Sequence, residues 1–340
     1  MENFEKIKSP DDNLNTTRNE ESLIAEKVSS ELEHTLERDL NKERGPKIKI
    51  KILFGAHGTA EEAEQLRGPL SQADIFIPEL AGWDVTGRLD LDDLSLGSIT
   101  PEVLLQKRKV TENNPSYKFL KREFEILYQS GKIIGLIDVT KNDPLYDRLV
   151  QTHFGQKRRD MLQSKNFAQL IEDFKRNIQE RAQVQREREN LLVDNLESEL
   201  KDLVEKYSYL KNKKEVNALL FLGAVHTRVY HILYPKMEDT SRNFGKETES
   251  YRFGYDMEAL RRYIFNKEIS DELAARAILE TVIASVTLSH LQDITSNFLK
   301  IMLYLKKVVK KFSIEEIRKI LESNDRSTDL IKVLTQKHIY

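Results

Sequence analysis

The chain contains no cysteine, and this absence excludes several kinds of chemistry. No disulfide framework can form, no thiol can act as a nucleophile, and no zinc site can use cysteine ligands. The sequence also has no run of about 18 consecutive apolar residues, so it predicts no transmembrane helix. The first residues lead into no apolar segment, and we expect no secretory signal. The expectation is therefore a soluble, cytoplasmic protein.

Proline and glycine are missing from the middle of the chain. Between Pro144 and Pro235 there is no proline. Between Gly155 and Gly223 there is no glycine. Because these two residues disfavour helix interiors more than any others, residues 158–211 are predicted to form one or two long helices. Charged residues make up 32% of the chain, which is typical of long helices with solvated faces.

The charge balance gives no electrostatic reason to expect a nucleic acid or a membrane as a partner. The formal net charge at pH 7 is −2. A local basic face, formed by two lysine pairs near residues 306–311, is a weak basis for nucleic-acid binding. We expect instead a small-molecule or peptide substrate, and homo-oligomerisation is left open.

Hydrophobic periodicity predicts an α/β protein with a mostly parallel sheet, long crossover helices and a helical C-terminal third. The predicted strands are 47–54, 73–77, 132–138 and 216–225. The predicted helices, besides the long central ones, are 60–73, 117–130, 271–311 and 313–323. Apart from a short helix near 101–108, residues 84–114 show no clear period, and residues 236–269 are also irregular.

Three regions follow from this pattern. Residues 1–45 are predicted to be a charged tail, disordered or weakly helical. Residues 46–235 are predicted to form the α/β core. Residues 236–340 are predicted to be helical and to pack on that core, because their apolar helix faces need a buried surface.

Polar side chains follow the predicted strands at the edge where ligands bind in open parallel sheets. His57 follows the first strand in the run Gly-Ala-His-Gly-Thr, and His226 ends the fourth in Gly-Ala-Val-His-Thr. Glu79 and Asp138 end the second and third strands. Two histidines at one sheet edge suit acid–base chemistry or metal binding. Each histidine also has a purely structural explanation, as a hydrogen-bonded turn residue.

The order of these motifs resembles the erythromycin-esterase-like proteins and the wider superfamily of TraB, Tiki and ChaN proteins. The resemblance spans about residues 50–235, with gaps. Four features carry it: the His57-Gly58-Thr59-Ala60-Glu61 turn, the strand-end Glu79, the Arg188-Glu189 pair in a later helix, and Gly223-x-x-His226. It implies an ester or amide hydrolase with catalytic residues His57, Glu79, Arg188 and His226. We add Glu61 and Asp138 as candidate substrate-binding residues.

The first motif departs from the pattern of these families. It reads Gly-x-His rather than Gly-x-x-His, and Phe54 and Gly55 stand where the erythromycin-esterase-like pattern carries a glutamate. That acid would help to activate the base or hold the substrate. The alternative is therefore a non-catalytic relative, which keeps the fold and binds a partner through its helical C-terminal region.

Two hydrolytic mechanisms remain open, one without a cofactor and one with a divalent metal. In the first, His57 is the general base for water, and Glu79 or Asp138 orients it. Arg188 then stabilises the oxyanion, and His226 is a second acid–base group. In the second, His57, Glu79 and His226 bind a metal with an open position for water. The motifs of serine hydrolases, P-loop ATPases and dinucleotide-dependent dehydrogenases are missing.

Overall fold

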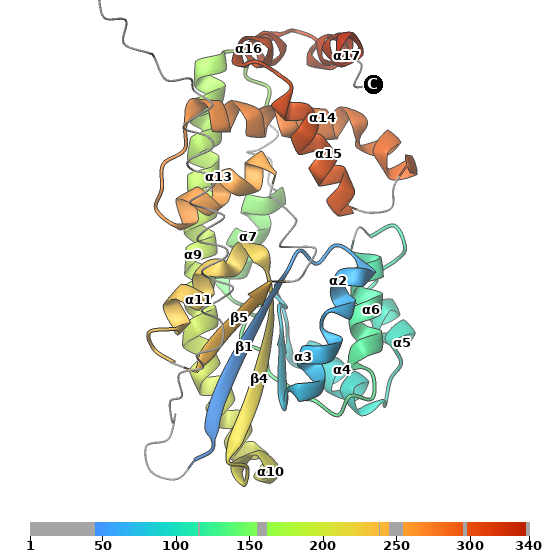
Figure 1. The fold of residues 1–340 in the computed structure, drawn as a ribbon, viewed down its shortest axis with the longest axis vertical. Helices are drawn as coiled ribbons and strands as arrows, with labels where there is room; N and C mark the ends of the chain where they lie inside the picture. Colours follow the sequence, from blue (N-terminus) through green and yellow to red (C-terminus); the bar gives the residue numbers. More distant parts are fainter. Residues whose placement is uncertain are drawn as a thin grey trace, which may run out of the picture.

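The computed structural model describes residues 45–114, 116–154, 162–237, 239–244, 254–294 and 298–337. The tail predicted at 1–45 lies outside these residues, except for Gly45. The described residues form a parallel sheet with helices on both faces, which confirms the α/β prediction (Figure 1). A helical lobe lies beyond the C-terminal ends of the strands (Figure 1).

The sheet has five strands in the order β3-β2-β4-β1-β5, and all neighbouring strands pair in parallel. They are β1 (Lys47–Gly55), β2 (Ile75–Pro78), β3 (Ile133–Ile134), β4 (Glu215–Gly223) and β5 (Thr240–Phe244). The two longest strands, β1 and β4, pair along their whole length, from Lys47 opposite Glu215 to Gly55 opposite Gly223. Their ends therefore lie level with each other.

Helices on one face of the sheet come from the connections between β1, β2 and β3. They are α2 (Ala60–Glu64), α3 (Arg67–Gln72), α4 (Val85–Leu96), α5 (Pro101–Lys107) and α6 (Tyr117–Leu127). Their apolar side chains pack on Leu53, Phe76 and Phe221. The opposite face packs on Ile52, Phe54 and Leu222. This second layer contains the C-terminal half of α9 (Phe167–Lys206), α10 (Ser208–Lys211) and α11 (Thr227–Leu233).

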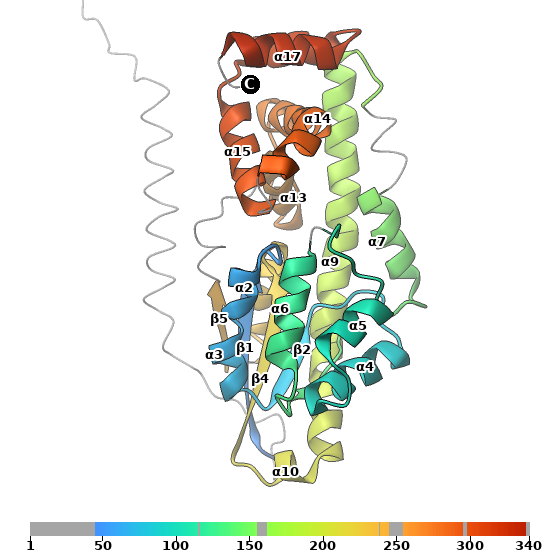
Figure 2. The ribbon, with the colours of Figure 1, turned by 90° about the vertical axis from the view of Figure 1, so that its right-hand side faces the viewer.

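The 40-residue helix α9 joins the sheet to the helical lobe (Figure 2). At 1.5 Å per residue it is about 60 Å long. Its N-terminal half shares one apolar core with the helices of the lobe, and its C-terminal half packs on the sheet. The lobe contains α13 (Tyr255–Ile264), α14 (Asp271–Ile294), α15 (Phe298–Lys310), α16 (Ile314–Glu322) and α17 (Arg326–Gln336). A further helix, α7 (Pro144–Phe154), packs beside the middle of α9.

Several elements differ from the sequence prediction. The segment predicted as one helix over 60–73 is split into α2 and α3, because Pro69 cannot continue a helix through the preceding turn. The strand predicted at 132–138 is only two residues long, because it pairs with the first residues of the short strand β2. The sheet also extends past residue 235, since β5 lies within the segment that showed no clear period.

Among the described residues, five helices form where the sequence showed no period or none was predicted, namely α4, α7, α11, α13 and α17. The helix α4 is capped at its start by Asp84, whose side chain accepts a hydrogen bond from Gly87 N, and at its end by Gly97 with φ of +79°. Its apolar residues Val85, Leu89 and Leu96 are exposed, which explains why no amphipathic pattern marks it. The last helix, α17, follows a cap at Asp325 and was not predicted.

The direction in which the chain leaves the sheet changes between the neighbouring strands β1 and β4. The chain leaves β1 towards the helices on one face, and it leaves β4 towards α11 on the other face. Such a switch point, at the carboxyl ends of the strands, is where open α/β sheets bind ligands. No helix in the described part of the chain is long and apolar enough to cross a membrane.

Candidate functional site

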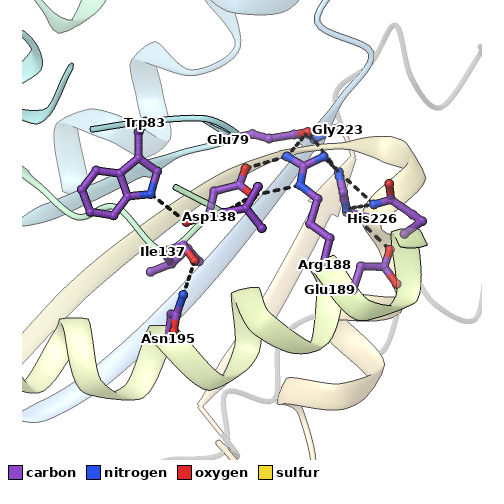
Figure 3. Close-up of polar contacts among 11 residues, drawn as sticks. Glu79, Trp83, Ile137, Asp138, Arg188, Glu189, Asn195, Gly223 and His226 are labelled. Atoms are coloured by element: carbon purple, nitrogen blue, oxygen red, sulfur yellow. Dashed lines mark hydrogen bonds and ion pairs between the residues drawn. The ribbon is translucent and has the colours of Figure 1, made fainter. Parts of the chain in front are cut away.

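Arg188 lies at the centre of a buried network that joins four elements (Figure 3). It projects from the middle of α9, where the two apolar cores of that helix meet. Its Nε and Nη2 donate to the two carboxylate oxygens of Asp138, at 2.9 and 2.5 Å. The same Nη2 donates to Glu79 Oε1 at 2.9 Å. We call Glu79, Asp138, Arg188 and His226 the charged cluster.

Glu79 follows β2 and accepts hydrogen bonds from three directions. Arg188 is one donor, His226 Nε2 lies 3.0 Å from Oε1, and the backbone N–H of Gly223 donates to Oε2. A Cβ on residue 223 would lie 2.9 Å from Oε2, so glycine is needed there for the carboxylate to approach the strand end. Burial alone would raise the pKa of Glu79, but His226 and Arg188 outweigh it and hold the pKa well below 4.5.

His226 occupies the short 3-10 turn η1 (Ala224–His226) between β4 and α11 and is fully buried. Its Nε2 faces Glu79, and its Nδ1 lies 2.8 Å from Gln185 Nε2 and 3.5 Å from Glu189 Oε1. Burial would lower its pKa, but the Glu79 carboxylate outweighs burial and raises the pKa to about 9. This pKa favours the imidazolium form at neutral pH, in which Nδ1–H must donate to an oxygen, either Glu189 Oε1 or the amide oxygen of Gln185 in place of its Nε2. In this form the charged cluster holds two cations and two carboxylates.

The backbone around Asp138 is fixed by side chains from both sides of the sheet (Figure 3). Trp83 Nε1 donates to Asp138 O at 2.7 Å, and Asn195 Nδ2 donates to Ile137 O at 2.9 Å. Asp138 Oδ1 also accepts from Val139 N at 2.8 Å. The carboxylate is 1% exposed, so its charge is compensated by Arg188 rather than by water. The position of Arg188 is thus determined by residues far apart in the sequence.

The loop that carries His57 is held by one carboxylate from α2. Glu62 accepts hydrogen bonds from Ala56 N and from Gly58 N, the second at 3.2 Å. Thr59 caps α2 by accepting from Glu62 N at 3.1 Å. The Thr-x-x-Glu spacing is that of a capping box, but here the glutamate binds the two amides that flank the histidine. His57 has φ of +54°, so this loop holds a non-glycine residue in the left-handed region.

The His57 ring is neutral, and aromatic residues hold it in place. It stacks on Phe119 of α6 at 4.8 Å between ring centroids and contacts Phe221 of β4 at 4.7 Å. Its Nε2 is buried and has no hydrogen-bond partner among the described residues. Burial lowers the pKa of His57 below 6.5, and the cations His226 and Arg188 lower it further, against the opposing effect of Glu79 and Glu62.

Gly55 and Gly223 bring the two histidines to the same edge of the sheet, at the ends of β1 and β4. These glycines are register partners on adjacent strands. A Cβ on Gly55 would lie 3.2 Å from the His57 ring, and one on Gly223 would lie 3.7 Å from the His226 ring. With strands about 4.8 Å apart, the two rings are no more than about 12 Å from each other. No hydrogen bond between described residues joins His57 to the charged cluster.

The structure therefore brings together five of the six predicted site residues. His57 lies beside the charged cluster, which contains Glu79, Asp138, Arg188 and His226. Glu61 is different, because it is exposed at the start of α2 while its neighbour Glu62 is buried. Asp138 contacts Arg188 rather than a histidine. A substrate-binding role for Glu61 has no support from this position.

Gln185 and Glu189 belong to the site but were not predicted. Both are buried on the face of α9 that carries Ala182 and Leu192, at helical spacing. Polar residues at positions of an inward-facing apolar stripe are costly unless they are paired. That interruption of the stripe is the sequence signal which marks them. Arg228, on α11, lies 3.5 Å from Glu189 and offsets its charge.

The donor atoms of the cluster do not suit a metal. Both oxygens of Glu79 accept hydrogen bonds, and the Nε2 of His226 faces Glu79. Among the described residues, no three histidine, aspartate or glutamate side chains are arranged to hold a metal ion. A metal on His57, His226 and Glu79 would have to displace Arg188 from the carboxylate.

The raised pKa of His226 predicts a pH-dependent contribution to stability. A histidine with a folded-state pKa near 9 stabilises the fold fully below its ordinary pKa of 6.5, and this contribution is lost as pH rises through 9. The free energy of unfolding should therefore fall between these values in the wild type and stay flatter in His226→Gln. Urea titrations at three pH values measure this difference. Parallel profiles would show that His226 is neutral in the folded protein.

No family model, no curated protein and no solved structure matched this chain.

Proposed function

We propose that the protein hydrolyses an ester or amide bond, with His57 as the general base. The observation that carries this proposal is the placement of the His57 ring beside the charged cluster, with a buried Nε2 that has no hydrogen-bond partner among the described residues. Burial lowers the pKa of His57, which favours the neutral imidazole. A base of this kind is available at neutral pH without prior deprotonation. The order His57, Glu79, Arg188, His226 is also the one implied by the resemblance to erythromycin-esterase-like proteins.

In the proposed reaction, His57 removes a proton from water as the water oxygen adds to the carbonyl carbon. The carbonyl oxygen then becomes an oxyanion. Arg188 Nη1 has no carboxylate partner among the described residues and lies 3.3 Å from His226 Nε2. Both atoms belong to cations at neutral pH, so they cannot satisfy each other, and together they favour a developing negative charge. The His57 imidazolium returns its proton to the leaving group as the bond breaks.

Glu79 and Asp138 have a positioning role in this mechanism. Their hydrogen bonds keep Arg188 and His226 in one orientation, so little reorganisation is needed when charge develops. Burial is the main cause of the lowered pKa of His57, and the same cations add to it. The glutamate missing before His57 is replaced in part by Glu62, which fixes the loop through its backbone amides. This reading needs no metal.

The alternative is a binding or scaffold protein with the same fold. Two observations favour it: the cations of the cluster are largely saturated by carboxylates, and the helical lobe has an apolar core of its own with α9. In that case the charged cluster only connects α9 to the sheet.

Replacing His57 by Ala should separate these two functions. We expect hydrolysis of p-nitrophenyl acetate and butyrate, or of the matching anilides, to fall at least about 100-fold, because a general base contributes 10²–10⁴-fold. The pH profile of the wild type should rise below pH 6.5, as His57 loses its proton, and fall near pH 9, as His226 does.

The matched control is His231→Ala, which changes a histidine on α11 that contacts Arg242 and Phe265 instead of the cluster. Its hydrolysis should equal that of the wild type. Melting temperatures of both variants should stay close to the wild-type value. Hydrolysis at the uncatalysed rate in the wild type, or an unchanged rate in His57→Ala, would favour the scaffold alternative.

A further inference from the structure

A cavity lies beside Glu79, on the face of the sheet that α4 and α6 cover. Its volume is about 40 Å³, enough for roughly three water molecules. The walls are mostly apolar and include Phe76, Leu91, Leu120, Phe124 and Leu127. Three ionisable residues also line it: Glu79, Arg108 and Glu123. Glu79 lines this cavity, and the other residues of the charged cluster do not.

Glu123 is buried in the wall of this cavity, with 7% of its surface exposed. It lies on α6 one turn after Phe119, so the same helix face touches His57 and lines the cavity. No side chain in the described part of the chain hydrogen-bonds its carboxyl group. Burial, and to a smaller extent Glu79, raise the pKa of Glu123 to about 7, although Arg108 opposes them. The carboxyl group therefore carries a proton in a large share of molecules near neutral pH.

Arg108 supplies a positive charge to the same cavity. It follows α5 and lies over the Phe124 ring, 5.4 Å from its centroid. Its Nη2 is buried and has no hydrogen-bond partner among the described residues. The nearby carboxylate of Asp90 is already paired with Lys107 at 2.6 Å. An unpartnered buried guanidinium nitrogen is costly unless a ligand meets it.

We propose that this cavity binds a small carboxylate of two or three carbons. The Arg108 guanidinium suits a carboxylate, because its planar N–H groups match the two oxygens. The protonated Glu123 donates a hydrogen bond to one of those oxygens. The apolar walls accept the methyl or ethyl group, and the volume limits its length. In the proposed hydrolysis, this carboxylate corresponds to the acid part of the bond that is cleaved, and that assignment rests on the proposed function. The binding site itself does not depend on the proposed function.

Binding of a carboxylate should take up a proton. The groups that face Glu123 are Arg108, from the end of α5, and Glu79, from the end of β2. On its own helix, Arg122 pairs with Glu125. A bound carboxylate adds negative charge beside Glu123 and favours its protonated form. Affinity should therefore be higher near pH 6 than near pH 8.

The test uses the full chain and sodium propionate, with binding followed by saturation-transfer NMR of the ligand methyl group and by the fluorescence of Trp83, the single tryptophan. We expect saturable binding, stronger at pH 6 than at pH 8, and none of propionamide, which has the same shape without the charge. Binding of both compounds alike, or no binding of propionate at tens of millimolar, would overturn the proposal.

Two variants locate the site. Arg108→Gln should weaken propionate binding by at least about tenfold, the loss of a charge-assisted hydrogen bond. Glu123→Gln should still bind propionate, but its affinity should no longer depend on pH. If the Arg108 variant folds poorly, this result tests the proposed site by itself. Arg122→Gln is the control, because this half-buried arginine of α6 pairs with Glu64 and Glu125 and does not line the cavity, and the variant should bind as the wild type does. Full affinity in Arg108→Gln, or an unchanged pH dependence in Glu123→Gln, refutes the site.

This proposal and the proposed function can fail separately. His57→Ala should still bind propionate, because His57 does not line the cavity. Propionate binding without any hydrolysis would support the carboxylate site and contradict the proposed hydrolase function. Hydrolysis that depends on His57, with no propionate binding, would support the hydrolase function and contradict the carboxylate site.

Discussion

Replacing Arg188 by Met should destabilise the folded protein by about 3–5 kcal/mol. The variant removes the only cation that touches Asp138 among the described residues, and Asp138 is 1% exposed. Glu79 loses one of its two cationic partners. A buried carboxylate without compensation is far more costly than a missing ion pair at the surface. Urea denaturation at pH 7 measures the change in the free energy of unfolding.

The control for this variant lies on the same helix. Arg176→Met removes a side chain of α9 that is 68% exposed and pairs with Asp173 at 3.5 Å, and we expect a change of no more than about 0.5 kcal/mol. Adding Asp138→Asn to Arg188→Met should restore part of the lost stability, because the neutral amide needs no counter-charge. A loss below about 1 kcal/mol in Arg188→Met would mean that water or a rearranged side chain compensates Asp138.

The strand ends could be predicted from the sequence because each follows an apolar run and a turn signal. Glycine and histidine at the ends of the runs 47–54 and 216–225 indicated both where the strands end and which side chains follow. The carboxyl ends of parallel strands share one edge, so His57, Glu79 and His226 were expected together. What the pattern does not contain is the pairing of Arg188 with Glu79, because these residues are 109 positions apart.

The other omissions have local physical causes. The strand β5 has a polar sequence and, within the described part of the chain, pairs with β1 alone, so it lacks the apolar run that marks a strand buried between neighbours. Glu123 lies on an amphipathic stripe of α6, between Phe119 and Leu127, where a carboxylate is easily read as surface charge. Burial is a property of the packed structure, and helical period alone does not report it.

Removing the last four helices should abolish cooperative folding of the remaining protein. A chain of residues 45–267 keeps the sheet and all of α9 but loses α14 to α17. Five large apolar residues of α9 would then lose most of their cover, namely Phe167, Leu170, Ile171, Phe174 and Ile178. Burial of each contributes about 1.5–3 kcal/mol, so their exposure removes roughly 8–15 kcal/mol. That range equals the whole stability of a typical domain.

The shortened chain should therefore aggregate, because an apolar helix face of this size is larger than soluble monomers usually expose. Size-exclusion chromatography and thermal unfolding of the 45–267 chain measure this. Polar replacements at Leu170, Phe174 and Ile178 in the same chain provide the control. If the lobe only covers α9, these replacements should restore a soluble monomer whose sheet melts cooperatively. A soluble, cooperatively folding 45–267 chain without them would show that α14–α17 form a separate domain, and that the sheet and its charged cluster do not depend on it.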